Sequence, residues 1–174
     1  MRITNLQPLI SEEAIQTRVK EMAGEISTLY KDEPLVVVCV LKGAFMFFSD
    51  LVRHLTCKPE LDFVRLASYG SAAQRSKTIT FTKDVEIPLE GKHVLIVEDI
   101  VDTGESIEHM IKELEARNPA SVEVCTLFFK PGSYRKTLPI KYRAMENGNE
   151  FIVGYGLDYD QLGRSLKDIY VVTE

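Results

Sequence analysis

Acidic and hydroxyl side chains follow one short apolar run in the middle of the chain. The run extends from Val94 to Val97, and the residues behind it read EDIVDTGES, from position 98 to 106. A short continuous apolar run of this kind predicts a buried strand. From Ile107 to Leu114 apolar residues recur at i, i+3, i+4 and i+7, which predicts an amphipathic helix. The stretch is therefore read as strand, acidic turn and helix.

The first two acids of this stretch are suited to a ligand. Glu98 and Asp99 follow the buried run, where a carboxylate is costly unless it is paired, solvated or bound to a metal. They could accept hydrogen bonds from ligand hydroxyls, such as those of a ribose, or help to hold Mg²⁺, which prefers oxygen ligands. Asp102 stands beside the turn and could act as a general base.

The small residues of the turn are suited to an anion. Thr103 to Ser106 lie where the strand becomes a helix, so free N–H groups and the positive end of the helix dipole favour a phosphate there. Gly104 permits close backbone approach, and Glu105 is expected to point to solvent. The alternative is a simple helix cap by Asp102 or Thr103.

The elements that must position these residues alternate along the chain. Helices are predicted at 11–30 and 44–55, strands at 35–41, 61–69, 79–87 and 122–130, a mobile loop at 70–78, a turn at Asn147-Gly148, a short strand at 151–155 and an edge strand at 168–174. Alternation from residue 35 to 130 predicts an α/β fold with a mostly parallel twisted sheet flanked by helices. Open sheets of this kind bind ligands beyond the carboxyl ends of their strands.

Composition excludes some classes of protein. The chain has 174 residues, which favours one domain, and its net charge of −5 disfavours a protein that coats nucleic acid. Its three cysteines form no CxxC pair, so buried free thiols are expected at Cys39 and Cys125. No apolar run approaches the roughly 20 residues that span a bilayer, and residues 1–13 contain no apolar signal-peptide core. A cytoplasmic protein without membrane contacts is expected.

Several motifs carry a resemblance to one family. VLIVEDIVDTGES (94–106) resembles the phosphoribosyl pyrophosphate signature of type I phosphoribosyltransferases, with Ser106 in the final hydroxyl position. Within that family, LKG (41–43) resembles the pyrophosphate loop of the hypoxanthine-guanine branch, and RLASYG (65–70) resembles its flexible catalytic loop. EFIVGYGLDYD (150–160) is similar to its purine-binding segment. The matches extend in order from residue 41 to 164 and cover nearly the whole chain.

The resemblance implies a fold and an activity. The fold would be a single phosphoribosyltransferase domain over 1–174, with a core at about 30–135 and a small hood from the termini, about 1–10 and 138–174. The reaction would transfer the 5-phosphoribosyl group from phosphoribosyl pyrophosphate to N9 of a 6-oxopurine, with Mg²⁺, in purine salvage. Hypoxanthine is expected first, guanine second and xanthine third. A homodimer or homotetramer without nucleic acid is also implied.

The resemblance also implies roles for individual residues. The phosphoribosyl group and its 5′-phosphate would be held by Glu98, Asp99, Asp102, Thr103, Gly104, Glu105 and Ser106. Pyrophosphate would be held by Lys42, Gly43 and Arg164, the purine by Lys130, Phe151, Ile152 and Asp158, and Mg²⁺ by Glu98, Asp99 and Asp158. Asp102 would be the catalytic acid or base at N7, Ser68 and Tyr69 would close over the reaction, and the Leu41-Lys42 peptide bond would be cis.

Each of these readings has an alternative in the residues themselves. Lys42-Gly43 could simply end a strand, Phe151 and Tyr69 could pack in the core, Asp158 could belong to a turn, and Arg164 could be a solvated surface residue. Glu150 stands where some members of the family carry a basic residue, which leaves guanine open. Two other functions remain: an RNA-binding regulator like the pyrimidine-operon attenuators, which share the fold, and a phosphoribosyltransferase for adenine, orotate or uracil.

Overall fold

A mostly parallel sheet forms the centre of the molecule. The structure is a computed structural model, and it describes residues 5–69 and 78–173. Within these ranges six strands pair in the order β4-β3-β2-β5-β6-β7. They are β4 (Thr78–Lys83), β3 (Glu60–Tyr69), β2 (Leu35–Leu41), β5 (His93–Val101), β6 (Ser121–Phe129) and β7 (Tyr142–Glu146). Only β4 runs antiparallel to its neighbour, and the predicted α/β class is confirmed.

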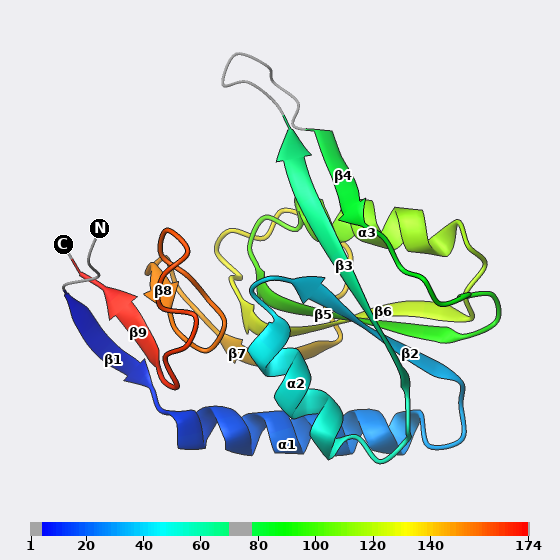
Figure 1. The fold of residues 1–174 in the computed structure, drawn as a ribbon, viewed down its shortest axis with the longest axis horizontal. Coiled ribbons are helices and arrows are strands. Elements are labelled where there is room, and N and C mark those ends of the chain that lie inside the picture. Colours follow the sequence, from blue (N-terminus) through cyan, green and yellow to red (C-terminus); the bar gives the residue numbers. More distant parts are fainter. Residues whose placement is uncertain (1–4, 70–77, 174) are drawn as a thin grey trace.

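Helices cover both faces of this sheet (Figure 1). Helices α1 (Glu12–Leu29) and α2 (Phe45–His54) pack on one face, and α3 (Glu105–Glu115) packs on the other. Strands of a sheet that is covered on both faces need apolar residues on both sides, and β2 accordingly reads LVVVCVL without a polar residue. The predicted helix start at Ser11 is confirmed, since the Ser11 hydroxyl accepts a hydrogen bond from the Ala14 amide at 3.3 Å.

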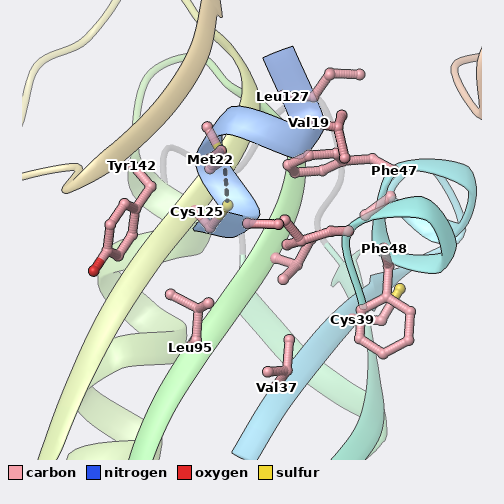
Figure 2. Close-up of a cluster of buried hydrophobic side chains, with 14 of the residues drawn as sticks. Val19, Met22, Val37, Cys39, Phe47, Phe48, Leu95, Cys125, Leu127 and Tyr142 are labelled. Carbon is pink, nitrogen blue, oxygen red and sulfur yellow. Dashed lines mark hydrogen bonds between the residues drawn. The ribbon is translucent and has the colours of Figure 1, made fainter. Parts of the chain in front are cut away.

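Alternate residues of the strands supply the two cores. Val37 and Leu95 face α1 and α2, whereas Val38 and Ile96 face α3. Figure 2 shows the first core, in which the Cys125 thiol lies 3.1 Å from the sulfur of Met22. Cys39 and Cys125 are buried free thiols, as predicted. Desolvation, followed by the charges of Glu98 and Asp99, raises the pKa of Cys39 to about 12, so this thiol stays protonated.

The two ends of the chain form a second, smaller sheet. Strand β9 (Ile169–Val172) pairs antiparallel with β1 (Leu6–Ile10) on one side and with β8 (Ile152–Val153) on the other. Figure 1 shows this sheet to one side of the central sheet, with β1 and β9 side by side. A second sheet formed from the two ends of the chain agrees with the predicted hood, but the predicted range of about 138–174 was too long, because β7 (Tyr142–Glu146) belongs to the central sheet. Among the helices of residues 5–69 and 78–173, none is both long and apolar enough to cross a membrane.

Two predicted strand boundaries were wrong, and two strands were missed. Strand β5 continues to Val101, so Glu98 and Asp99 lie inside it rather than in a turn behind it. Strand β4 ends at Lys83 rather than at residue 87. Strands β1 and β7 were not predicted at all.

Candidate active site

The acids of β5 lie within the strand because its pairing with β6 continues past them. Glu98 lies opposite Thr126, Ile100 opposite Phe128 and Val101 opposite Phe129. Lys130 follows the last pair, and its amide donates to the Val101 carbonyl at 3.0 Å. The register therefore brings the ends of β5 and β6 together and places Lys130 beside the acidic stretch.

Glu98 is a carboxyl group in a poorly solvated place. It is 8% exposed, and its Oε1 accepts a hydrogen bond from the Asp99 amide at 3.1 Å. Desolvation, and then the charge of Asp99, raise the pKa of Glu98 well above its usual range. Asp99 is half-buried, and its Oδ1 accepts from the Ile100 amide at 2.7 Å. A ligand that brings hydroxyl donors or a cation would relieve this crowding of negative charge.

The start of α3 contains a cavity of about 150 Å³, which we call the α3 cavity; it is lined by Glu98 and by residues 100–107. Gly104 occupies the N-cap position with φ +87°, and no side chain caps the helix. The alternative of a cap by Asp102 or Thr103 is therefore wrong. The free amides of α3 remain available to an anion. Glu105 is exposed, as predicted, and so are Thr103 and Ser106.

Asp102 and Lys130 face each other across the end of the sheet. The Lys130 ammonium lies 4.0 Å from a carboxylate oxygen of Asp102, and the side chain of Lys130 is 17% exposed against 52% for Asp102. Lys130 is thus a partly enclosed hydrogen-bond donor, and Asp102 is an accessible acceptor. Such a pair can bind a planar polar ring and exchange a proton with it.

A second cavity, of about 210 Å³, lies next to this pair; we call it the Lys130 cavity. It is lined by Asp99, Ile100, Lys130, Glu150, Phe151, Ile152, Leu157 and Asp158. Phe151 is 53% exposed, and its ring meets that of Tyr159 edge to face, with the centroids 5.5 Å apart. The alternative that Phe151 packs in the core is therefore wrong. Its exposed ring is available to stack on an aromatic ligand.

The Lys42-Gly43 loop lies against both the acids and the segment behind β8. The Leu41-Lys42 peptide bond is cis, as predicted. A Cβ atom at Gly43 would overlap the carboxylate of Asp99, and one at Gly156 would overlap the Gly43 carbonyl. With Asp99 and the loop where they lie, neither glycine has room for a side chain. The backbone of the loop is thereby placed at the carboxyl end of β5.

Arg164 is held in place, contrary to the alternative of a solvated residue. Its Nη2 lies 2.7 Å from Oδ1 of Asp158, and its Nη1 donates to the Gly156 carbonyl at 2.9 Å. The other carboxylate oxygen of Asp158 accepts from the Gln161 amide at 2.8 Å. The Lys42 ammonium donates to the Gln161 side chain at 3.1 Å. Both cations, Lys42 and Arg164, therefore contact the side chain of Gln161, at 3.1 and 3.4 Å.

The predicted lid lies largely outside the described part of the chain. Ser68 and Tyr69 end β3, where their backbones pair with Ile79 and Thr78. Residues 70–77 of the expected loop, and the side chains of Ser68 and Tyr69, are not described. Sequence reasoning overlooked Gln161 and Leu157, and it considered Glu150 only in relation to guanine; all three contact or line the site. Leu157 could have been found from the sequence, since it lies in the EFIVGYGLDYD motif.

The oxygen donors fit a hard cation only in part. Glu98, Asp99 and Asp158 offer carboxylates near the two cavities. Across residues 5–69 and 78–173, however, no group of three His, Cys, Asp or Glu side chains could by itself hold a metal ion. Mg²⁺ commonly binds through one or two carboxylates together with ligand phosphates and water. The donor set therefore fits Mg²⁺ that arrives with an oxygen-rich ligand.

Comparison with known proteins gives a consistent result. A sequence profile described as "Phosphoribosyl transferase domain" matches residues 10–160. The chain is 39% identical to a hypoxanthine phosphoribosyltransferase of Haemophilus influenzae, over 95% of this chain and 94% of that one. It is 38% identical to a hypoxanthine-guanine-xanthine phosphoribosyltransferase of Tritrichomonas foetus, over 95% and 91%. The crystal structure of a hypoxanthine-guanine phosphoribosyltransferase from Bacillus anthracis superposes with a TM-score of 0.91 at 36% identity, covering 96% of this chain and 98% of that one.

Proposed function

We infer the function from one premise: the chain belongs to the phosphoribosyl transferase family. It is a phosphoribosyltransferase of purine salvage. The reaction moves the 5-phosphoribosyl group from phosphoribosyl pyrophosphate to N9 of hypoxanthine, and of guanine, and it yields IMP or GMP and pyrophosphate. The bond from C1 to the pyrophosphate oxygen breaks, its electron pair leaves with pyrophosphate, and N9 forms the new bond to C1.

One observation carries this proposal. The α3 cavity and the Lys130 cavity lie on either side of the end of β5 and share Ile100 in their linings. The first has the free amides that suit a 5′-phosphate, and the second has the exposed ring and the lysine that suit a purine. Glu98 lines the first and Asp99 lines the second, so the two acids lie where the ribose would join phosphate to base.

The pyrophosphate would leave toward the two cations. Growing negative charge on a leaving group is best stabilised by donors that are already in place. Lys42 and Gly43 would supply backbone amides, and Arg164 would supply a guanidinium. Glu98, Asp99 and Asp158 would hold Mg²⁺ together with oxygens of phosphoribosyl pyrophosphate. When bound, the metal acts as a Lewis acid that neutralises pyrophosphate charge.

The purine would be recognised by its 6-oxo group. Lys130 would donate to O6, Phe151 would stack on the ring, and Ile152 would place its backbone near the base edge. Asp102 would accept the proton that the base loses as N9 bonds to C1, through N7. Adenine carries an amino group where Lys130 needs an acceptor, and an unpaired buried donor is costly. This mismatch disfavours adenine as a substrate.

We expect the enzyme to be a cytoplasmic homo-oligomer, either dimer or tetramer. Its buried thiols are free, which suits a reducing compartment. Helix α2 exposes 37% of Phe45, while Leu61 and Phe63 on β3 are 43% and 37% exposed. The ring of Phe63 contacts that of Phe48, one turn from Phe45 on α2, with centroids 5.2 Å apart. This apolar patch suits an interface with a second copy of the chain, and light scattering of wild type and Phe45→Glu tests it.

Turnover of a panel of bases tests the function. Wild-type protein, phosphoribosyl pyrophosphate and Mg²⁺ are mixed separately with hypoxanthine, guanine, xanthine or adenine, and nucleotide formation is followed by ultraviolet absorbance. We expect turnover of hypoxanthine and guanine that stops when EDTA is added, and little turnover of adenine. No turnover of any base, together with salt-sensitive RNA binding, would instead favour the regulator of the same fold.

A further inference from the structure

The segment that follows β8 makes an unusual turn. Gly154, Tyr155 and Gly156 have φ values of +112°, +47° and +99°. Glycine adopts such angles freely, but an aromatic residue rarely does. A tyrosine between two glycines therefore keeps this conformation only where contacts outside the turn hold it.

The side chain of Tyr155 provides such a contact. Tyr155 is 5% exposed, and its hydroxyl donates a hydrogen bond to Oδ2 of Asp50 on α2 at 2.5 Å. The same oxygen accepts from the side-chain amide of Gln16 on α1 at 2.5 Å. The remaining oxygen of Asp50 lies 3.9 Å from Arg53, whose side chain is 78% exposed. Burial, and then the hydrogen bond to Asp50, raise the pKa of Tyr155, so its hydroxyl remains a donor.

The backbone of the same turn meets the candidate active site. The α-carbon of Gly156 faces the Gly43 carbonyl so closely that a Cβ would overlap it. The Gly156 carbonyl accepts from the Arg164 guanidinium at 2.9 Å, and the Gly156 amide donates to the Arg164 carbonyl at 2.9 Å. A shift of the turn would therefore move Arg164 and Gly43 relative to each other.

Helix α2 connects these observations. It begins at Phe45, directly after the loop that ends β2 (Figure 1), so Asp50 ties the turn to the element that carries Lys42-Gly43. We propose that Asp50 is a positioning residue for the pyrophosphate end of the site, acting through Tyr155. The role of that end rests on the proposed function. Gln16 assists by holding the same carboxylate oxygen from α1.

Tyr155→Phe is the mildest test, because it removes only the hydroxyl. Pyrophosphorolysis of IMP gives the KM for pyrophosphate, and the forward reaction gives the KM for hypoxanthine. We expect the KM for pyrophosphate to rise about tenfold, which is about 1.4 kcal/mol, while the KM for hypoxanthine changes less than twofold. Tyr170→Phe is the matched control, because its hydroxyl bonds Asp168 at 3.2 Å within the hood, on β9. It should leave both KM values unchanged.

Variants of Asp50 separate positioning from general stability. Asp50→Asn keeps an acceptor oxygen, so its KM for pyrophosphate should stay close to that of wild type. Asp50→Leu should raise the KM for pyrophosphate as much as Tyr155→Phe does. The double variant Asp50→Leu/Tyr155→Phe should raise this KM no further than either single variant. In hydrogen–deuterium exchange without substrate, peptides over residues 154–164 should exchange faster in Tyr155→Phe but not in Tyr170→Phe.

Two results would overturn the proposal. One is a Tyr155→Phe enzyme whose KM for pyrophosphate stays within twofold of wild type. The other is a fall in kcat alone, with every KM unchanged, which would indicate a purely structural role. Failure of the wild type to transfer a phosphoribosyl group would instead count against the proposed function. Exchange in residues 154–164 would then still decide whether Asp50 holds the turn.

Discussion

Gly43→Ala should damage activity far more than stability. The new methyl group would overlap Oδ2 of Asp99 and approach its Cγ to 2.5 Å. Gly43 is not among the residues with positive φ, so alanine is compatible with the backbone at this position. The carboxylate of Asp99 is the far end of a short side chain, so it can rotate away. Rotation relieves the clash but removes Asp99 from the position in which we expect it to hold the ribose.

The two costs can be estimated separately. An off-rotamer side chain costs about 0.5–1.5 kcal/mol. For a chain of 174 residues, about 1 kcal/mol corresponds to roughly 2–4 °C in Tm, so Tm should fall by no more than about 6 °C. A catalytic group misplaced by about 1 Å costs about 100-fold in rate. The kcat/KM for phosphoribosyl pyrophosphate should therefore fall by about 100-fold.

The assay compares kcat/KM and Tm in two glycine variants. Gly24→Ala is the control, because Gly24 lies within α1 and a Cβ there would have no neighbour within 4 Å. Alanine in a helix interior is favoured over glycine by about 0.5–1 kcal/mol, so this variant should keep full activity and gain a few degrees in Tm. If Gly43→Ala retains kcat/KM within threefold of wild type, the close approach of the loop to Asp99 is not functional.

Three further predictions concern single side chains. Asp102→Asn should lower kcat by about 100-fold with a modest change in purine binding, and an unchanged kcat would remove the acid/base role. Lys130→Ala should narrow the preference for hypoxanthine over adenine, and unchanged kcat/KM ratios among the bases would exclude Lys130 from base reading. Asp62→Asn should lower the free energy of unfolding by about 2 kcal/mol at pH 7, because buried Asp62 accepts from the amides of Glu86 and Ile87 at 2.7 and 2.9 Å. Desolvation alone would raise the pKa of Asp62, but these two hydrogen bonds, a third from the Phe63 amide and the charge of Lys83 keep that pKa lowered. The stability that the Asp62 carboxylate contributes is therefore present above about pH 4 and is lost as pH falls through the folded pKa. In urea unfolding, the difference in free energy between wild type and Asp62→Asn should be smaller at pH 3 than at pH 7.

Local patterns were sufficient for the elements that have a clear hydrophobic pattern. The continuous apolar run of β2 predicted a buried strand, and the i, i+3, i+4, i+7 spacing in α3 predicted an amphipathic helix, because both patterns are formed by residues close together in the chain. The same reasoning ended β5 too early. Glu98 interrupts the apolar pattern, but pairing with β6 continues and keeps the strand intact.

Contacts between distant segments explain what was missed. Strand β1 contains Pro8 and exposes most of its residues, so it is stabilised mainly by pairing with β9 at the other end of the chain. Strand β7 reads YRAME and alternates poorly, because it lies at the edge of the sheet beside β6. Neither pairing leaves a local signal.

The candidate site divides in the same way. The β5–α3 motif could be read directly, since its acids, glycine and hydroxyls are contiguous. The close approach of Gly156 to Gly43 joins two segments that lie far apart in the sequence. The hydrogen bond from Tyr155 to Asp50 spans 105 positions, and nothing in either local pattern marks it.

The most direct test of the central claim is a comparison of two ligands that differ only in the 5′-phosphate. Isothermal titration calorimetry of wild-type enzyme with IMP and with inosine gives both Kd values under one set of conditions. If the start of α3 is a phosphate site, IMP should bind at least about 100-fold more tightly, since about 2.7 kcal/mol is what one or two charge-assisted hydrogen bonds supply. Equal affinities would contradict the assignment of residues 103–106 to the phosphate.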